Sequence, residues 1–279
     1  IERFIYGYFF SYYKKMKPLE EIRLSEMYGD PFDYGKKILD IRIGDVAKNI
    51  SFENDPILVR EMYFALTQLY YDSLIERGSV TPDQEKVWKD VCLAGKAITG
   101  SFYRNQGVNY DAVNTFLVPN LGDIIESIEG TGNLESTFRH CIYRYRSVYH
   151  FGRNLPNFIE EIGHPDTLVA VATGAFEPAF LAMDILEIDD VLPIRHSRVS
   201  RNDKYPRFLD NGDSSYPEKL LNEKKVLIID DMVDTGKTMV RIESLVNQFD
   251  PKKLDMCTVK KFTQVEDPLE RVRELGRNH

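Results

Sequence analysis

Short apolar runs rich in β-branched residues alternate with helical patterns in the second half of the chain. The runs are Leu168–Ala172, Val191–His196, Val226–Ile229 and Met256–Val259. The helical patterns are Asn154–Ile162, Glu177–Leu186 and Met239–Phe249. Strands that alternate with helices at this spacing predict an α/β fold, a parallel sheet covered by helices on both faces. Ligands of such sheets bind at the carboxyl ends of the strands, in the loops that follow.

The first part of the chain has the spacing of amphipathic helices instead. A helix start at Asp55–Pro56 leads into an apolar stripe that ends at Gly78. The segment Thr81–Gln84 is a second start signal, of the capping-box type. The change of pattern predicts two parts: a mainly α-helical N-terminal region, residues 1–150, and an α/β domain, residues 151–279.

The composition excludes a basic nucleic-acid arm and a stapled miniprotein. There are 36 Lys and Arg against 44 Asp and Glu, a net charge of −8, so binding to a nucleic-acid backbone is not the expected function. Cys92, Cys141 and Cys257 lack metal-ligand spacing, and we expect buried thiols in a reducing compartment. The longest apolar run, Phe4–Tyr13, is too short to span a bilayer. We therefore expect a cytoplasmic protein without a membrane segment.

The most informative stretch is Val226–Thr238, which reads Val-Leu-Ile-Ile-Asp-Asp-Met-Val-Asp-Thr-Gly-Lys-Thr. Its four apolar residues predict a buried strand, with Asp230 and Asp231 at the end. The turn Asp234–Thr238 then leads into a helix. Backbone N–H groups at a helix start make a cradle for a phosphate, and Gly236 allows the phosphate to approach closely.

Two carboxylates beside a phosphate cradle indicate a second task, because they cannot contact the phosphate favourably. Carboxylates accept hydrogen bonds from sugar hydroxyls and suit the neighbourhood of a divalent cation. A ligand with a phosphate and a ribose that keeps its hydroxyls fits both features. A P-loop needs glycine where Asp231 stands, and no strand-to-helix turn carries GxGxxG, so both motifs are excluded. The alternative is an ordinary strand end with solvated acids.

This stretch resembles the phosphoribosyl-pyrophosphate (PRPP) motif of type I phosphoribosyltransferases, most closely the hypoxanthine-guanine branch. The resemblance implies that fold over residues 154–265. It also implies that Asp230 and Asp231 bind the ribose hydroxyls and lie near Mg²⁺, directly or through water. The residues implied to hold the 5-phosphate are Asp234, Thr235, Gly236, Lys237 and Thr238. Asp234 is in addition the implied catalytic base, which accepts the proton of the acceptor.

Three further segments are similar in place to parts of that family. The loop residues Thr173, Gly174 and Ala175 correspond to the loop whose amides hold the pyrophosphate, although the purine enzymes usually carry a lysine at the position of Thr173. The basic start of the polar stretch Ser197–Pro217 corresponds to a lid, and the implied lid residues are Arg195, Arg198 and Arg201. Lys260 matches the lysine that contacts an exocyclic oxygen of the base. From composition alone, a solvated loop and a solvated lysine remain alternatives.

The chain also departs from the family. Where the family has a fifth strand and a hood over the base, only a helical-looking segment, Pro268–Leu275, and a short tail follow. Residues 1–150 have no counterpart in the small purine salvage enzymes, and they would supply the hood, a dimer contact or recognition of the acceptor. The apolar Phe4–Tyr13 segment must be buried, which favours a homo-oligomer, in the simplest case a dimer.

The resemblance thus implies a Mg²⁺-dependent phosphoribosyltransferase, a pentosyltransferase of nucleotide metabolism. It would move the ribose 5-phosphate of PRPP to a nitrogen acceptor, a nucleobase as in purine salvage, and release pyrophosphate. Its partners would be PRPP and a small acceptor, not nucleic acid or a membrane. A second interpretation is a PRPP- or nucleotide-binding regulator that has lost transfer. A third is a helical interaction protein that uses the α/β part only as a scaffold.

Overall fold

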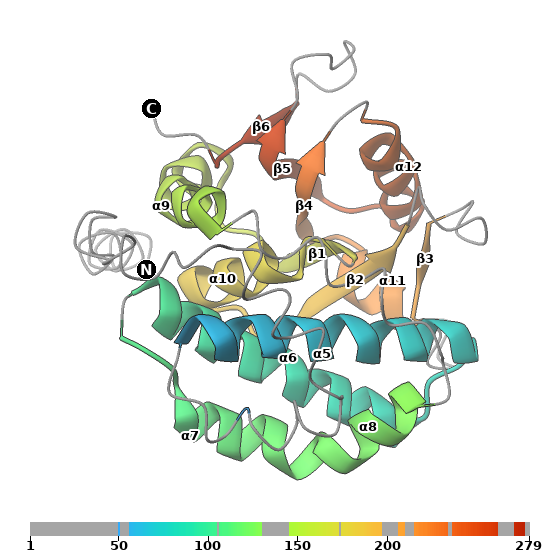
Figure 1. Ribbon diagram of the computed structural model, residues 1–279. Coiled ribbons are helices and arrows are strands. Elements are labelled where there is room, and N and C mark those ends of the chain that lie inside the picture. The colour runs from blue at the N-terminus through green and yellow to red at the C-terminus, as the bar shows by residue number, and fades with distance from the viewer. Residues whose placement is uncertain are drawn as a thin grey trace. The chain divides into compact units, whose positions relative to one another are not determined.

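The structure is a computed structural model, shown as a ribbon in Figure 1. It describes residues 50, 56–104, 106–129, 145–172, 174–196, 206–209, 215–233, 236–261 and 271–276. Contacts divide the chain into two compact units. The first comprises Ile1–Glu76 and Lys86–Tyr145, and the second comprises Arg77–Glu85 and Arg146–His279.

The first unit is built from helices. Its long helices are α5 (Pro56–Arg77) and α6 (Pro82–Tyr103), and α8 (Leu121–Glu129) follows them. Between α6 and α8 lie α7 (Tyr110–Ala112), the π-helical η1 (Val113–Leu117) and the 3-10 helix η2 (Val118–Asn120). The predicted boundaries of α5 are confirmed where the chain is described, since the helix begins at Pro56 and ends just before Gly78. None of the described helices has the length and apolar character needed to cross a membrane.

The predicted capping box is present at the start of α6. The backbone N–H of Gln84 donates to Thr81 Oγ1 at 3.3 Å, and the backbone N–H of Thr81 donates to Gln84 Oε1 at 3.0 Å. Each side chain thus satisfies a backbone donor that the first turn of a helix leaves without an intrahelical partner. The helix start was therefore correctly predicted from the sequence.

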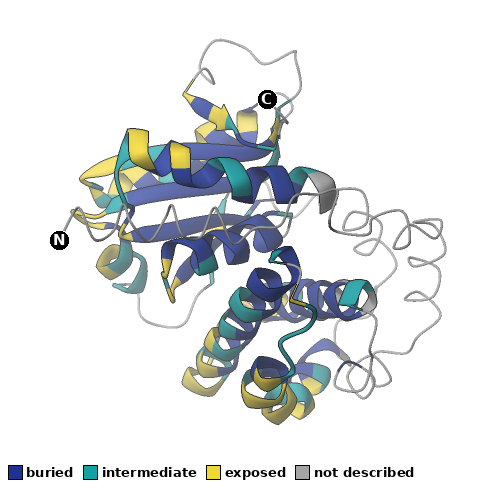
Figure 2. Ribbon diagram, turned by 90° about the vertical axis from the view of Figure 1, so that its left-hand side faces the viewer, coloured by how far each residue is buried: buried dark blue, intermediate teal, exposed yellow. Residues whose placement is uncertain are grey.

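Aromatic side chains fill the interior of the first unit, whose buried positions are dark blue in Figure 2. Tyr63 and Tyr71 of α5 are fully buried. The Tyr63 hydroxyl donates to the backbone oxygen of Val91 in α6 at 2.5 Å, which gives a buried polar group its partner. Burial raises the pKa of Tyr63 well above its usual value. The ring of Trp88 packs on Tyr71 with a centroid distance of 5.2 Å, so both long helices contribute to this core.

The second unit contains a six-stranded sheet in the order β3-β2-β1-β4-β5-β6. The strands are β1 (Thr167–Ala172), β2 (Val191–Arg195), β3 (Arg207–Phe208), β4 (Lys225–Val233), β5 (Lys253–Lys261) and β6 (Val272–Glu274). All neighbouring strands pair in parallel except β3, which is antiparallel to β2. The four predicted runs are β1, β2, β4 and β5, so the mainly parallel sheet is confirmed.

Helices cover both faces of this sheet. They are α9 (Tyr145–Ile162), α10 (Phe176–Leu186), α11 (Tyr216–Leu221) and α12 (Lys237–Val246), which continues into the 3-10 helix η4 (Asn247–Phe249). The crossovers through α10 and α12 run in opposite directions along the sheet, so a right-handed connection places these helices on opposite faces. Figure 1 shows α9 and α10 on one side and α12 on the other. Every residue of the central strand β1 is accordingly buried.

Two expectations about strands were wrong. The strand expected to end at Ile229 continues through the acidic pair to Val233, because β5 also continues and pairs with it as far as Lys261. The helix expected over Pro268–Leu275 is absent from the described residues 271–276, where β6 pairs in parallel with β5. An edge strand exposes charged side chains, so its pattern was mistaken for the polar face of a helix.

Two other segments were predicted incompletely. The pattern over Asn154–Ile162 is the second half of α9, which begins at Tyr145. The helix therefore passes through residue 150, where we expected the boundary between the helical N-terminal region and the α/β domain. The stretch Ser197–Pro217 was expected to be a loop. Within its described residues it contains β3 and the first residues of α11. A two-residue strand gives too short a pattern to be recognised in a sequence.

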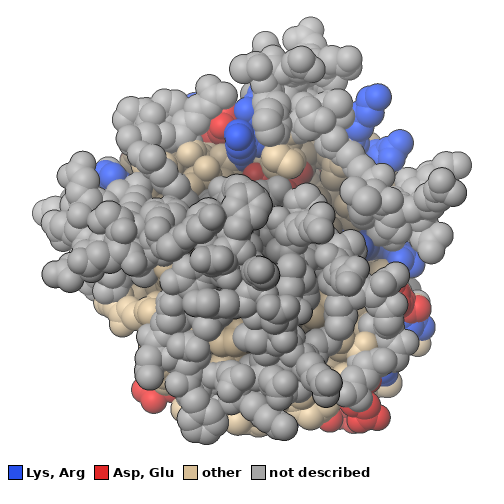
Figure 3. Space-filling model, in the orientation of Figure 1, with Lys and Arg blue, Asp and Glu red and all other residues tan. Residues whose placement is uncertain are grey.

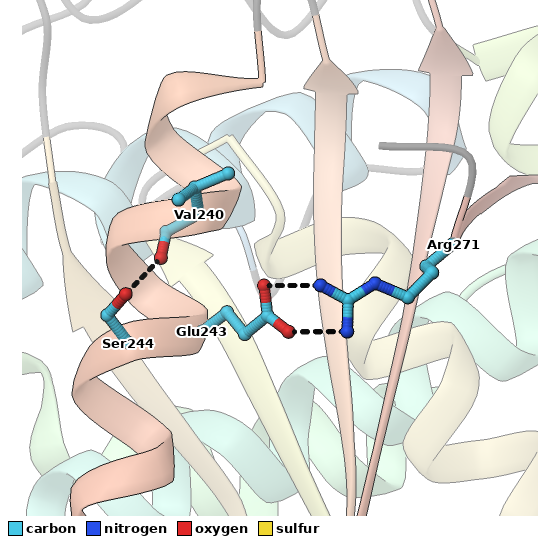
Figure 4. Close-up of polar contacts among 4 residues, drawn as sticks. All are labelled: Val240, Glu243, Ser244 and Arg271. Atoms are coloured by element: carbon cyan, nitrogen blue, oxygen red, sulfur yellow. Dashed lines mark hydrogen bonds and ion pairs between the residues drawn. The ribbon is translucent and has the colours of Figure 1, made fainter. Parts of the chain in front are cut away.

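The start of β6 is tied to α12 by a two-point ion pair. Arg271 Nη1 lies 3.0 Å from Glu243 Oε1, and Arg271 Nη2 donates to Glu243 Oε2 at 3.3 Å (Figure 4). Figure 4 also shows the Ser244 hydroxyl donating to the backbone oxygen of Val240, a bond within α12. The planar guanidinium matches the carboxylate at two points, so this pair fixes orientation as well as distance.

The other side of β6 is tied to α9. Arg273 forms an ion pair with Glu161, and its guanidinium lies 5.9 Å from the centre of the Phe158 ring. After the strand, Asn154 Nδ2 donates to the backbone oxygen of Leu275 at 2.6 Å. A three-residue edge strand is thereby held to one helix on each face of the sheet.

We predict that Gly276→Ala destabilises this edge. The backbone N–H of Gly276 donates to Val259 O at 3.0 Å, and a Cβ at residue 276 would overlap that same backbone oxygen. Such overpacking costs about 1–3 kcal/mol, to be measured by urea unfolding. Gly122→Ala in α8 is the matched control, because its Cβ would meet open space. Equal free energies of unfolding for the two variants would contradict the close approach at Gly276.

Candidate functional site

The candidate site lies at the carboxyl edge of the sheet, where four parallel strands end next to one another. β1 and β2 end together at Ala172 and Arg195. The last pair between β4 and β1 is Ile229 with Ala170, and β4 continues to Val233, where β5 is its neighbour among the described strands. The acidic pair therefore lies in a strand rather than in the loop after it. The edge of this strand that faces β1 lies next to the loop that follows β1.

Asp230 and Asp231 lie on opposite faces of the sheet, because successive side chains of a strand alternate. Asp230 is only 4% exposed, and its Oδ1 accepts a hydrogen bond of 2.8 Å from the backbone N–H of Asp231. Its register partner on β5, Thr258, is fully buried. Asp231 is partly exposed. The two acids thus differ in burial and in what surrounds them.

Gly174 packs directly against the carboxylate of Asp231. A Cβ built on Gly174 would be too close to Cγ, Oδ1 and Oδ2 of Asp231 for any real side chain. The loop after β1 and the acidic strand β4 therefore meet, as the sequence-based assignment of both segments to one site requires. Ala175 is fully buried at the start of α10, and its N–H donates to Val171 O at 3.1 Å. Thr173 lies outside the described residues.

The turn from β4 into α12 is described from Gly236 onward. Gly236 is the N-cap of α12 and has a φ of 72°, a left-handed conformation that glycine adopts without strain. Thr238 is buried and Lys237 is exposed, in the first turn of the helix. The N–H groups of a first helical turn and the helix dipole both favour an anion there. Asp234 and Thr235 lie outside the described residues.

Cations stand at the ends of the two strands that flank β1 and β4. Arg195 is the last residue of β2 and pairs in register with Ala172 and Arg207, so it belongs to the sheet rather than to a loop. Lys260 and Lys261 end β5. In the upper part of Figure 3, over the second unit, Lys and Arg side chains lie close to Asp and Glu side chains. The lid residues Arg198 and Arg201 lie outside the described residues.

Lys261 is a candidate that sequence reasoning missed. Its register partner is Val233, two residues beyond Asp231, so Lys261 and Asp231 lie on the same face of the sheet. Lys260 pairs with Met232 and lies on the Asp230 face. The register of β4 with β5 is needed to tell the two lysines apart, because in the sequence they are adjacent and chemically alike. The Lys260 assignment stays a prediction.

The described cysteines are buried, as expected. Cys92 and Cys257 have no disulfide partner, and Cys141 lies outside the described residues. Burial, with the carboxylate of Asp255 as the smaller cause, raises the pKa of Cys257 far above its usual value. A thiol that stays protonated is a poor nucleophile, so Cys257 is part of the core. Among the residues that the structure describes, no cluster of three or more His, Cys, Asp or Glu side chains forms a cage for a metal ion.

Residues 147–271 match the family of phosphoribosyl transferase domains. The match covers the second unit from α9 to the start of β6 and includes every candidate site residue named above. Together with the strand order, it identifies the fold of the α/β unit as that of the type I phosphoribosyltransferases. No curated protein matches the chain.

Several solved structures are similar to part of the chain. A purine phosphoribosyltransferase from Pyrococcus horikoshii is 22% identical, with a TM-score of 0.34 over 44% of this chain and 75% of that one. A hypoxanthine-guanine phosphoribosyltransferase from Bacillus anthracis is 19% identical, with a TM-score of 0.35 over 46% and 74%. A hypothetical protein from Neisseria gonorrhoeae with bound ppGpp is 19% identical, with a TM-score of 0.39 over 48% and 80%.

A double-mutant cycle tests the contact at the centre of the site. Gly174→Ala forces the new methyl group against the Asp231 carboxylate, and such overpacking costs about 1–3 kcal/mol of unfolding free energy. In an Asp231→Ala background the same substitution costs clearly less, because the atoms it meets are gone. Chemical denaturation of the four proteins measures both values. Additive effects of the two substitutions would show that residues 174 and 231 are not in contact.

Proposed function

We propose that the α/β unit, whose residues 147–271 match the phosphoribosyl transferase domain, binds PRPP and transfers its ribose 5-phosphate to a nitrogen acceptor. The observation that carries the proposal is the close approach of Gly174 to Asp231. It brings the loop after β1 and the acidic strand together, next to the start of α12. A ligand at this edge meets backbone amides, carboxylates and a helix N-terminus at once, which suits a sugar with a phosphate at either end.

The start of α12 is the proposed site of the 5-phosphate. Gly236 and the first-turn residues Lys237 and Thr238 offer backbone N–H groups, a hydroxyl and a cation. Asp234 and Thr235, outside the described residues, would complete the cradle. The ribose hydroxyls then donate to carboxylate of the acidic strand, since carboxylates are strong acceptors.

The loop after β1 is the proposed site of the pyrophosphate. The Gly174 amide, and that of Thr173 outside the described residues, would hold the pyrophosphate, whereas the Ala175 N–H already donates to Val171 O. Arg195 ends the neighbouring strand. Arg198 and Arg201 would supply further cations as lid residues. Exclusion of water by a lid strengthens every charge interaction with the leaving group.

Mg²⁺ fits this donor set. The partly exposed carboxylate of Asp231 provides a hard oxygen ligand, held directly or through water. Mg²⁺ usually binds one or two carboxylates together with water and substrate phosphates, so it needs no complete protein cage. When bound, it would neutralise the negative charge that develops on the pyrophosphate. The Asp231 carboxylate then lies beside an anion without net repulsion.

The proposed reaction is a displacement at the anomeric carbon of PRPP. The bond from that carbon to the pyrophosphate oxygen breaks with its electron pair leaving on pyrophosphate, and a bond to the acceptor nitrogen forms. The acceptor loses its N–H proton to Asp234. Lys260 would contact an exocyclic oxygen of a nucleobase acceptor. Positioning and charge stabilisation supply most of the rate in such a scheme.

The alternative is a regulator that binds PRPP or a nucleotide and does not transfer. The missing lysine at Thr173 and the large helical N-terminal part favour it. The expected homodimer rests on Phe4–Tyr13, which lies outside the described residues.

Calorimetry and a release assay on the full chain separate these functions. We expect Mg²⁺-dependent binding of PRPP, with ribose 5-phosphate and pyrophosphate alone binding more weakly because each fills only part of the site. We also expect pyrophosphate release with at least one member of a panel of purine and pyrimidine bases. Binding without release for any base would support the regulator instead. Failure to bind PRPP in the presence of Mg²⁺ would overturn the transferase and the PRPP-binding regulator.

A further inference from the structure

We infer that Arg241 of α12 is a further ligand-binding residue, which contacts the 5-phosphate of PRPP, and that His196 is a positioning residue that holds the Arg241 guanidinium at the carboxyl edge of the sheet. Neither residue belongs to the stretch Val226–Thr238 or to the loop after β1. The inference rests on the proposed function, because it adds a cation to the proposed phosphate cradle.

A hydrogen bond joins α12 to the end of β2. Arg241 Nη1 lies 3.3 Å from Nε2 of His196, the residue that directly follows β2. Arginine has no acceptor, so Arg241 donates and Nε2 of His196 accepts. The imidazole is therefore neutral in this contact and carries its proton on Nδ1. The two residues are 45 positions apart in the chain, so the contact depends on the fold.

Both partners of this hydrogen bond are fixed in place by the surrounding structure. His196 is only 7% exposed, whereas Arg241 is exposed. At the far end of α12, the Phe249 ring of η4 packs on the Phe208 ring of β3, with centroids 5.7 Å apart. β3 in turn pairs with β2. The helix is thus anchored to this part of the sheet after its last turn and, through Arg241, near its start.

Helix geometry places the Arg241 side chain over the first turn of α12. Side chains of a helix tilt toward its N-terminus, and residues three or four apart lie on the same face. Arg241 is three residues after Thr238 and four after Lys237, which belong to the proposed cradle. Its hydrogen bond to the residue after β2 shows that the guanidinium reaches the carboxyl edge. The cation and the cradle therefore lie at the same edge of the sheet, on the side that α12 covers.

A guanidinium held in this way suits a phosphate. It carries five N–H groups in one plane, so a hydrogen bond to His196 is compatible with a two-point contact to phosphate oxygens along another edge. A long side chain that is already held loses less conformational freedom when the ligand binds. The full charge of Arg241 also adds to the partial positive charge of the helix start. The 5-phosphate is then bound by backbone amides, Lys237 and Arg241 together.

Binding of PRPP and its fragments to the full chain tests the role of Arg241. Ribose 5-phosphate carries only the 5-phosphate, whereas pyrophosphate belongs to the loop after β1. We expect Arg241→Gln to weaken binding of ribose 5-phosphate and PRPP by about tenfold or more, and to change pyrophosphate binding by less than about twofold. Lys252→Gln is the matched control, because it removes the same charge from an exposed residue just before β5, at the opposite edge of the sheet. Calorimetry in the presence of Mg²⁺ gives these affinities.

Two amides at residue 196 test the positioning. In His196→Gln the amide oxygen can take the place of Nε2, whereas in His196→Asn it stops near the position of Nδ1 and does not reach Arg241. We expect His196→Asn to weaken binding of ribose 5-phosphate by about fivefold, and His196→Gln to restore most of that affinity. In an Arg241→Gln background, His196→Asn should have no further effect, because the side chain that His196 positions is gone.

The outcomes separate this inference from the proposed function. Wild-type protein that binds PRPP, with Arg241→Gln unchanged toward ribose 5-phosphate or weakened equally toward pyrophosphate, overturns the role of Arg241 alone. Equal losses in His196→Asn and His196→Gln, or a loss by His196→Asn that persists in the Arg241→Gln background, overturn the positioning role. If the His196 variants do not fold, the Arg241→Gln measurement decides. Wild-type protein that binds neither PRPP nor ribose 5-phosphate overturns the proposed function and this inference with it.

Discussion

The contact between Gly174 and Asp231 is the constraint on which the candidate site depends. It exists because β4 continues past the end of β1, so that a carboxylate stands beside the loop that β1 leads into. Any side chain at residue 174 would occupy the space of that carboxylate. The rest of the second unit supports this geometry: β5 extends β4 by pairing, and α12 begins directly beyond it.

Charge balance decides what the site can hold. Two like charges 4 Å apart repel by about 4 kcal/mol at an effective dielectric constant of about 20, so a carboxylate and a pyrophosphate cannot share this edge unaided. A divalent cation between them turns that repulsion into attraction. The acidic composition of the chain is therefore compatible with the proposed anionic ligand, because the phosphates would be held by amides, by a helix start and by a few cations such as Arg195 and Lys261.

Local patterns in the sequence predicted the elements well and their pairing poorly. The runs that became β1 and β2, the helix α10 and the capping box at Thr81 each depend on neighbours in the chain, and each was predicted. The length of β4 depends on its pairing with β5, and β6 depends on pairing with a strand ten or more residues away. Neither can therefore be predicted from a local sequence pattern. The same limit applies to the site. The acidic pair and Gly174 were predicted as site residues, but only the structure shows that Asp231 lies against Gly174 and shares a face with Lys261, while Asp230 is buried on the other face.

A crystal structure of the full chain with PRPP and Mg²⁺ would show whether the ligand binds at the carboxyl edge of the sheet. We expect the 5-phosphate at the start of α12, the pyrophosphate on the loop at Gly174, and ribose hydroxyls or the cation within reach of the Asp231 carboxylate. Electron density for PRPP away from the carboxyl edge of the sheet would contradict the proposed binding site.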